Sequence, residues 1–354
     1  MYRISKLIYI VLIVVLAIWL IPWTYDFFTL KSESVPFTLY SEVADDFVMR
    51  GSKDLDLPFT DLAGNEYTQR EFDLLLPLFY VRQLTSDARF PAEIKGKPIT
   101  PHQAQTGNFV FRSIPSELNR PTVDLHFLLE SMSGRVELTM PDDIFRLTST
   151  GIQFLDMDHN KLKVEKSERF TVAMKSKGFE FPAKLIAGNP TTRKDYDEGY
   201  LIVDANNKLF HLKQTVGRPY VRAIALPEGL QLAQMFVTEF RSKLTLGLLV
   251  DKNHKLYALE TESYKVKSVD IPQFNPLDEV MTIFGNLMHW TIKIEHEDQI
   301  RFYAVDATNY QLLKSHTFTA SNEGFFTRWR SVLMPLRLAF TSPRDKYVYP
   351  RFNL

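Results

Sequence analysis

The feature that most constrains this chain is an uncharged apolar stretch close to its N-terminus. Residues Leu7 to Trp23 read LIYIVLIVVLAIWLIPW, seventeen positions without a charged side chain. As a helix rising about 1.5 Å per residue, this segment would be roughly 25 Å long, which is enough to cross the hydrocarbon core of a bilayer. The sequence therefore predicts a transmembrane helix over 7–23, with the lipid bilayer as its partner.

The basic residues around this segment predict its orientation. Arg3 and Lys6 precede it, and the next basic residue is Lys31. Because positive charge stays on the cytoplasmic side, we expect residues 1–6 to form a cytoplasmic stub and everything after Trp23 to be exported. No other stretch approaches eighteen apolar residues. A single-pass topology is therefore expected.

A cleaved signal peptide is the alternative interpretation of the same segment. Cleavage requires small residues in an A-x-A-like arrangement after the apolar run. Here the run ends in Ile21-Pro22-Trp23-Thr24-Tyr25, which is bulky at the relevant positions. The sequence favours an uncleaved anchor and leaves the signal peptide open.

Composition excludes several classes of protein. The 354 residues contain 42 basic and 42 acidic side chains and no cysteine. Zero net charge argues against nucleic acid as a partner, because neutralising phosphates requires a basic excess. The lack of cysteine excludes disulfides, Cys-type zinc sites, iron–sulfur clusters and thiol catalysis. We expect no cofactor.

Residues 24–120 combine helix and loop signals, which predict a small juxtamembrane α/β region. Thr68 and Glu71 have the spacing of a capping box, and the apolar pattern of residues 71–84 fits a helix with one buried face. Pro77 is expected to kink or restart that helix, and Thr100-Pro101 is a second helix start.

After residue 120 the sequence alternates in short runs that are typical of strands. Residues 123–128, 135–139 and 151–155 are examples. Leu201–Leu212 (LIVDANNKLFHL) matches Leu248–Leu259 (LLVDKNHKLYAL) at a shift of 47. Looser copies lie near Asn160, at 292–303 and at 339–349, each with an Asp/Asn turn between apolar runs. Asp and Asn suit such turns because they tolerate a left-handed backbone.

Four strands in each repeat of 40 to 50 residues are typical of a β-propeller blade. The second period contains four such runs: Leu209–Gln214, Tyr220–Leu226, Leu232–Glu239 and Leu244–Val250. Five units of 47 would need about 235 residues, and 121–354 supply 234. The predicted fold is mainly β: a transmembrane helix, the mixed region, and a propeller-like domain of about five blades over 121–354. One C-terminal strand and three early strands would close the ring. An open stack of sheets or a sandwich is the alternative.

No catalytic motif stands out. Phosphate-loop, dinucleotide-binding, zinc-protease and nucleophile-elbow patterns do not occur, and no two histidines are spaced i, i+4. Asp156, Asp158 and Asn160 have the spacing that opens a calcium loop, but Lys161 and Ser167 stand where glycine and glutamate are needed. We therefore expect a structural turn and no metal site.

The most unusual loop lies between two predicted strands over Ala187–Gly199. It gathers charged side chains around one tyrosine and is a candidate site for a ligand or protein partner. The residues concerned are Asn189, Arg193, Lys194, Asp195, Tyr196, Asp197 and Glu198. The alternative is a solvated connection whose opposite charges pair with one another. Near the C-terminus, residues 325–337 fit either a basic amphipathic helix or a strand-forming segment.

With these residues in view, the chain resembles a family of bacterial single-pass membrane proteins catalogued as a domain of unknown function. The resemblance covers nearly the whole chain and rests on five segments: Tyr67–Asp73, Pro141–Arg146, Lys177–Lys184, the Gly188–Tyr200 loop and Phe210–Lys213. It implies an envelope protein of anaerobic Gram-negative bacteria that acts beside transporter components. It implies no activity and no catalytic residues.

These inferences lead to two functional expectations. The first is a non-enzymatic binding or scaffold module, anchored in the inner membrane with its C-terminal domain in the periplasm and bound to a protein partner there or in the membrane. It could serve as an accessory of an envelope or transporter complex. The second is a propeller-type glycan hydrolase, which needs two carboxylates roughly 5–9 Å apart in its channel. Asp142 and Asp143 are an example of adjacent carboxylates.

Overall fold

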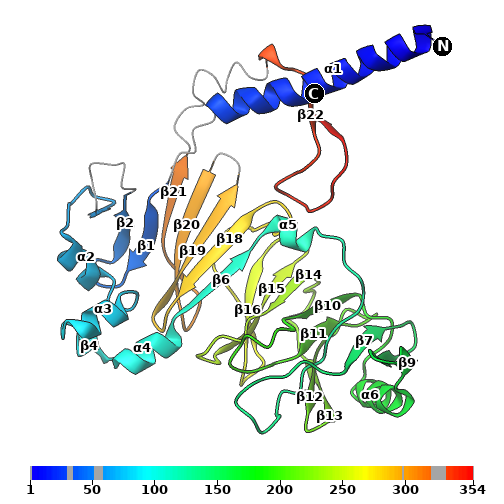
Figure 1. The fold of residues 1–354 in the computed structure, drawn as a ribbon. Coiled ribbons are helices and arrows are strands. Elements are labelled where there is room, and N and C mark those ends of the chain that lie inside the picture. The colour runs from blue at the N-terminus through cyan, green and yellow to red at the C-terminus, as the bar shows by residue number, and fades with distance from the viewer. Residues whose placement is uncertain (1, 30–34, 52–58, 297–298, 320–331, 354) are drawn as a thin grey trace.

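The fold was analysed in a computed structural model that describes residues 2–29, 35–51, 59–296, 299–319 and 332–353. Figure 1 shows one long N-terminal helix beside a body built mainly of antiparallel β-sheets. The prediction of a mainly β protein with an N-terminal apolar helix is confirmed.

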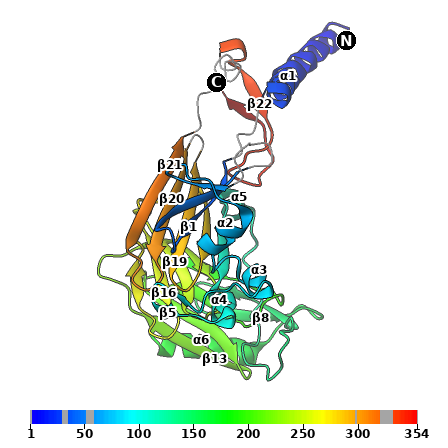
Figure 2. The same ribbon diagram turned by 90° about the vertical axis from the view of Figure 1, so that its left-hand side faces the viewer.

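Helix α1 (Tyr2–Thr29) contains the predicted apolar segment and is the only helix in the described chain that is long and apolar enough to cross a membrane. The most apolar part of α1 contains no buried residue. In Figure 2 the helix extends away from the β-sheets. By length and composition, α1 fits a membrane anchor and a signal sequence equally well.

The predicted mixed region contains short strands and helices. Its elements are β1 (Phe37–Ser41), β2 (Asp46–Arg50), β3 (Phe59–Asp61), α2 (Gln69–Leu75), α3 (Val81–Ser86), β4 (Glu93–Ile94), β5 (Lys97–Pro98), α4 (Pro101–Gly107), β6 (Phe109–Ser113) and α5 (Pro115–Leu118). Thr68 caps α2 and Thr100 caps α4, each in a complete capping box, so both predicted helix starts are confirmed. Pro77 follows the end of α2, and the expected helix over 71–84 is split in two.

The repeat forms three successive antiparallel sheets. The first contains β10 (Leu185–Gly188), β11 (Tyr200–Val203), β12 (Leu209–Thr215) and β13 (Arg218–Ile224). The second contains β14 (Leu232–Val237), β15 (Thr245–Asp251), β16 (Leu256–Glu260) and β17 (Val266–Ser268). The third contains β18 (Val280–Gly285), β19 (His289–His296), β20 (Gln299–Asp306) and β21 (Leu312–Thr319). All four strands predicted for the second period are present.

The 47-residue shift has a structural basis in the turns. Asn160, Asn207 and His254 are each 47 residues apart, and all three have a positive φ of 50 to 62°. Asp204 Oδ1 accepts hydrogen bonds from the amides of residues 206 and 208, and Asp251 Oδ1 accepts from those of 253 and 255. The Asp side chain thus fixes the same turn in successive sheets.

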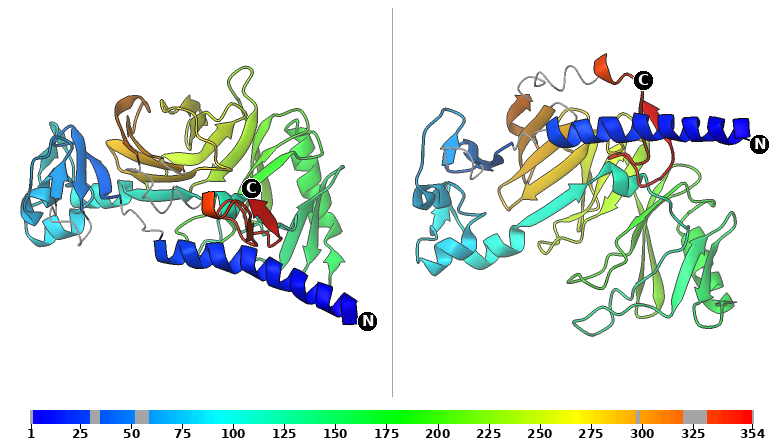
Figure 3. Two further views of the ribbon diagram at one scale, coloured as in Figure 1. Left: turned by 90° about the horizontal axis from the view of Figure 1, so that it is seen from above. Right: turned by 45° about the horizontal axis from the view of Figure 1, so that its top comes forward.

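The described sheets follow one another in an open arc and do not close into a ring (Figures 1 and 3), so a count of five blades is not confirmed. The strands expected to complete a fifth blade lie apart. β22 (Arg337–Ala339) pairs with β23 (Arg351–Asn353), while β7 (Asp143–Leu147), β8 (Ile152–Asp156) and β9 (Lys161–Leu162) form a separate sheet. Closure failed as a prediction because strand spacing does not specify strand partners.

Three further expectations need correction. Residues 123–128 and 135–139 are not strands, apart from an isolated bridge between His126 and Phe145. A helix that was not predicted, α6 (Val164–Ser176), packs Phe170 and Met174 into the core beside β8. Of the copy of the repeat at 339–349, Ala339 ends β22, and the rest connects β22 to β23 with one isolated bridge between Ser342 and Asp345. Of the segment 325–337, residues 325–331 lie outside the described chain.

Strand β6 joins the mixed region to the repeat. It pairs antiparallel with β18 in register, from Phe109 opposite Gly285 to Ser113 opposite Met281, and so becomes the fifth strand of the third sheet. The Phe109 ring lies against Gly285, where an added Cβ would approach it to 2.1 Å. The same ring stacks on Phe240 at 3.8 Å.

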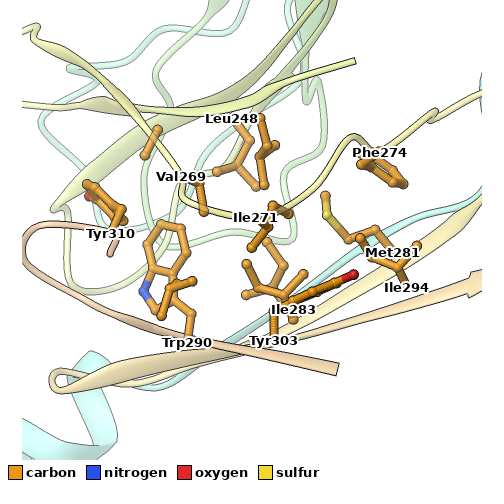
Figure 4. Close-up of a cluster of buried hydrophobic side chains, with 14 of the residues drawn as sticks. Leu248, Val269, Ile271, Phe274, Met281, Ile283, Trp290, Ile294, Tyr303 and Tyr310 are labelled. Carbon is orange, nitrogen blue, oxygen red and sulfur yellow. The ribbon is translucent and has the colours of Figure 1, made fainter. Parts of the chain in front are cut away.

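The largest core cluster lies between the second and third sheets (Figure 4). Leu248 from β15 meets Met281 and Ile283 from β18 and Trp290 from β19. Phe274, in the connection between these sheets, is fully buried in the same cluster. Burial of these apolar side chains holds the two sheets face to face.

The C-terminal hairpin returns to α1. Figures 1 and 3 show β22 beside this helix, and Phe340 packs edge-on against Trp19 with ring centroids 5.5 Å apart. Val348, Tyr349 and Phe352 of the same hairpin are exposed.

The β6–β18 register predicts the effect of Gly285→Ala. The added methyl group would collide with the Phe109 ring, which Phe240 and Trp290 hold in place, so the free energy of unfolding should fall by about 1–3 kcal/mol. In a Phe109→Leu background the same substitution should cost distinctly less. Urea denaturation of the four proteins measures this coupling, and purely additive effects would contradict the register.

Candidate functional site

The candidate loop connects β10 to β11 and is held mainly by charges within the protein. Lys194 Nζ lies 2.7 Å from Asp197 Oδ1 and 2.6 Å from Glu239 Oε1, and it also donates to the Asn189 carbonyl at 2.7 Å. The side chains of Asp197 and Glu239 are only 1% exposed. Lys194 therefore pairs with two buried carboxylates at once.

The remaining polar atoms of this cluster are also satisfied. Asp197 Oδ2 accepts from Ser131 Oγ at 2.7 Å, and Glu239 Oε2 accepts from Asn189 Nδ2 at 2.9 Å. The Glu198 amide donates to Glu239 Oε1 at 2.7 Å. Burial raises the pKa of Glu239, although Lys194 and the Glu198 amide offset part of this effect. Such a satisfied network fixes the loop rigidly.

Glu198 extends the network toward strand β12. Its Oε2 lies 2.6 Å from Lys213 Nζ, and its carbonyl accepts from His211 Nε2 at 2.5 Å. Because a carbonyl can only accept, the proton is on Nε2, and His211 Nδ1 accepts from the Tyr264 hydroxyl at 2.8 Å. Burial lowers the pKa of His211, so this histidine is neutral at pH 7.

The other predicted site residues make their contacts outside the cluster. Asp195 pairs with Arg241 at 2.7 Å on the surface, and Arg193 is exposed. Tyr196 donates to the Phe240 carbonyl at 2.7 Å. The structure therefore brings Asn189, Lys194, Asp197 and Glu198 together and leaves Arg193, Asp195 and Tyr196 outside the cluster. Whether the loop binds a ligand stays a prediction.

A wide central groove lies beside this loop. It has a volume of about 850 Å³ and is bounded by β6, β10, β14 and the segment 114–127. Its aromatic lining includes Phe111, Phe236 and Tyr200, and Arg112 and Arg120 add positive charge. Asn189 reaches this groove from the candidate loop. The central groove is thus larger than the pocket around Glu42 described below.

The groove does not provide the carboxylate pair that the glycan hydrolase alternative requires. Among its described lining residues, Glu117 is the sole carboxylate, and it contacts Lys346 and lies 3.5 Å from Arg120. Asp142 and Asp143 lie elsewhere, held by Lys163 and Lys166 at 2.7 and 2.8 Å. The central groove therefore lacks the required carboxylate pair among its described lining residues, and the hydrolase stays an untested alternative.

A smaller pocket of about 300 Å³ lies where β1, the α2–α3 turn, β6, β18 and β19 meet. It contains Glu42, only 3% exposed, and His289, only 4% exposed. Glu42 Oε2 lies 3.7 Å from His289 Nδ1, while Glu42 Oε1 has no hydrogen-bond partner. The Tyr40 amide donates to Thr291 Oγ1 at 3.0 Å and so joins β1 to β19 behind the pocket.

Burial shifts both titratable groups of this pocket toward their neutral forms. It raises the pKa of Glu42 to about 7, against smaller opposing effects from the Glu42 and Leu78 amides and Lys95. It lowers the pKa of His289 to about 4. Ionisable groups with such shifts in one apolar pocket are typical of functional sites.

Sequence reasoning missed this pocket. Glu42 lies in the turn after β1 without any motif, and His289 was one of eight scattered histidines. Nothing in the sequence pairs residues 247 positions apart, because their contact depends on β1 packing against β19.

No group of three or more His, Asp or Glu side chains that could hold a metal ion occurs within the described residues. At the calcium-like spacing, Asp156 Oδ1 instead accepts from the His159 amide at 2.9 Å in the β8–β9 turn. This contact fits the expected structural turn.

Residues 37–305 match the family described as DUF4857, a domain of unknown function. The chain belongs to the DUF4857 family. The matched region includes the small pocket, the candidate loop, the first two repeat sheets and the third sheet up to β20, whereas β21 follows it and α1 precedes it. No curated protein matches the DUF4857 chain.

Among solved structures, the DUF4857 chain is similar to one entitled "Structure of Dos1 propeller". The two share 11% identity and a TM-score of 0.29 over 50% of this chain and 45% of that chain. The DUF4857 chain therefore spans less than half of that protein, and a likeness this weak carries no argument about fold or function.

The buried ion cluster predicts a large effect of Lys194→Met. This substitution leaves Asp197 and Glu239 buried without a cation, so the free energy of unfolding should fall by about 3–5 kcal/mol. Arg241→Ala is the matched control, because it breaks the exposed pair with Asp195 and should cost no more than about 1 kcal/mol. Equal effects in chemical denaturation would contradict a structural role for Lys194.

The small pocket predicts a pH-dependent effect of Glu42→Gln. Between pH 4.5, the ordinary pKa of a glutamate, and pH 7, the folded wild type retains a proton on Glu42 that the unfolded chain releases. Wild-type stability therefore falls with rising pH relative to the variant, by at most about 1.4 kcal/mol per pH unit. The free energy of unfolding of the wild type minus that of Glu42→Gln should therefore decrease from pH 4.5 to 7 and then level off. A difference that does not change with pH would contradict the buried position of Glu42.

Proposed function

We propose that this protein is a non-enzymatic binding module anchored in the inner membrane by α1, with its β-sheets in the periplasm. The observation that carries the proposal is the exposed apolar surface of α1. Leu7, Val11, Val14 and Leu20 are all about half exposed or more, and no residue in the most apolar part of the helix is buried. Such a surface is stable in lipid and costly in water.

The charges around α1 support the proposed orientation. Arg3 and Lys6 precede the apolar segment, and basic residues at this position favour a cytoplasmic N-terminus. The contact of Phe340 with Trp19 would then hold the C-terminal hairpin at the periplasmic face of the bilayer, where exposed aromatic side chains are favoured.

The proposed binding surface is the central groove, and its occupant is a segment of a protein partner in the membrane or periplasm. Aromatic and arginine side chains dominate the contacts that bind proteins tightly. Phe111, Phe236 and Tyr200 offer such contacts, while Arg112 and Arg120 favour an acidic segment. The partner would belong to an envelope or transporter complex, as the family resemblance implies.

The anchor and orientation can be tested with single cysteines, because the natural chain has none. In intact sphaeroplasts a membrane-impermeant maleimide should label Val216→Cys, on an exposed turn, and should label Ile4→Cys only after permeabilisation. The labelled chain should also stay in the membrane at alkaline pH. Labelling in the reverse order, or release of a shortened chain, would contradict the proposal.

The groove can be tested by placing a photo-reactive residue at Arg112 in cells. Irradiation should give a protein adduct that is lost when Arg120 is changed to Glu, because that substitution reverses a charge in the groove. The same photo-reactive residue at Val216, outside the groove, is the control. Absence of an adduct at 112, or the same adduct at both positions, would refute binding in the groove.

A further inference from the structure

The small pocket around Glu42 has the build of a ligand site separate from the central groove. Its volume of about 300 Å³ is within the range of pockets for small organic molecules. Leu39, Leu76 and Phe284 provide apolar walls. Phe79 and Val110 also line it and are themselves exposed, so the pocket can be reached from solvent.

Two acceptor atoms in this pocket lack hydrogen-bond donors. Glu42 Oε1 and Asn108 Oδ1 are buried without a partner in the described chain. The Asn108 Nδ2 group donates to the Leu78 carbonyl, so Asn108 Oδ1 is the atom that remains without a partner. A buried acceptor without a donor costs stability, and a ligand that brings donors would recover that loss.

The charges that face Glu42 do not neutralise it. His289 on β19 is the nearest basic group, and its pKa of about 4 leaves it neutral at pH 7. Lys95 lies in the β4–β5 turn and is paired with Asp45. Asp306, whose charge also acts on His289, is acidic. The pocket therefore has a buried carboxyl group and no cation of its own.

We propose that this pocket binds a small organic ammonium ion. The ammonium group donates hydrogen bonds to Glu42 Oε1 and Asn108 Oδ1, and an apolar group of the ligand packs against Leu39, Leu76 and Phe284. Binding converts Glu42 to the carboxylate, and the proton that it releases goes to the solvent. This site does not depend on the partner proposed for the central groove.

Calorimetric titration of the full chain in detergent tests the proposal with three probes of similar shape. Phenethylammonium should bind, whereas 2-phenylethanol, which has no charge, and 3-phenylpropionate, which has the opposite charge, should bind at least about tenfold more weakly. If 3-phenylpropionate or 2-phenylethanol bound as tightly as phenethylammonium, the proposal would be overturned.

Variants then assign the binding to Glu42. Glu42→Gln keeps the size of the side chain and should weaken the binding of phenethylammonium at least about tenfold. Glu93→Gln removes the same charge from an exposed position in β4 and should leave binding unchanged. Equal affinity in wild type and Glu42→Gln would overturn the proposal, provided that thermal unfolding shows both proteins folded.

The pH dependence is a second readout that does not require a variant. Below the pKa of Glu42, the bound ammonium must displace a proton, so affinity should fall about tenfold for each pH unit below 7 and change little above it. Proton release during titration at pH 6 should be visible as a buffer-dependent heat. Affinity that is constant from pH 5.5 to 8 would contradict the site.

Discussion

The structure depends on the pairing of β6 with β18, because this one strand takes part in both cavities. Phe109 and Val110 line the small pocket, and Phe111, Arg112 and Ser113 line the central groove. The aromatic rings of β6 also reach the second sheet: Phe109 stacks on Phe240, and Phe111 meets Phe236 at 5.2 Å. Without this strand the third sheet would have an open edge, and both cavities would lose a wall.

The protein contains two kinds of buried carboxyl group, one paired with a cation and one without. Around Lys194 every carboxylate has a cation and further donors, so the cluster fixes the β10–β11 loop and offers no free group to a ligand. Around Glu42 the carboxyl group is buried beside a neutral histidine with one oxygen unpartnered. Satisfied networks stabilise a fold, whereas a polar group left without a hydrogen-bond partner in a pocket indicates a ligand site.

Local chemistry made part of this fold predictable. Features that depend only on neighbours in sequence are present in the structure as predicted. They are the capping boxes at Thr68 and Thr100, the break at Pro77 and the Asp turns at 204 and 251. Some failures were local, such as the missed helix α6, but those that decide the architecture were non-local. β6 pairs with a strand about 170 residues later, the ring does not close, and Glu42 meets His289 only after β1 packs on β19. The charged loop was found as a feature, but sequence could not show that its charges face one another.

The pairing of β6 with β18 is tested most directly by disulfide formation in a chain that has no natural cysteine. Arg112 lies opposite Thr282, and Thr282 lies opposite Lys293 on the next strand. Arg112→Cys with Thr282→Cys should form a disulfide under mild oxidation. Arg112→Cys with Lys293→Cys should not, because two strand spacings place their Cα atoms roughly 10 Å apart. Peptide mapping measures both yields. A disulfide in the second pair and none in the first would contradict the architecture on which both proposed sites depend.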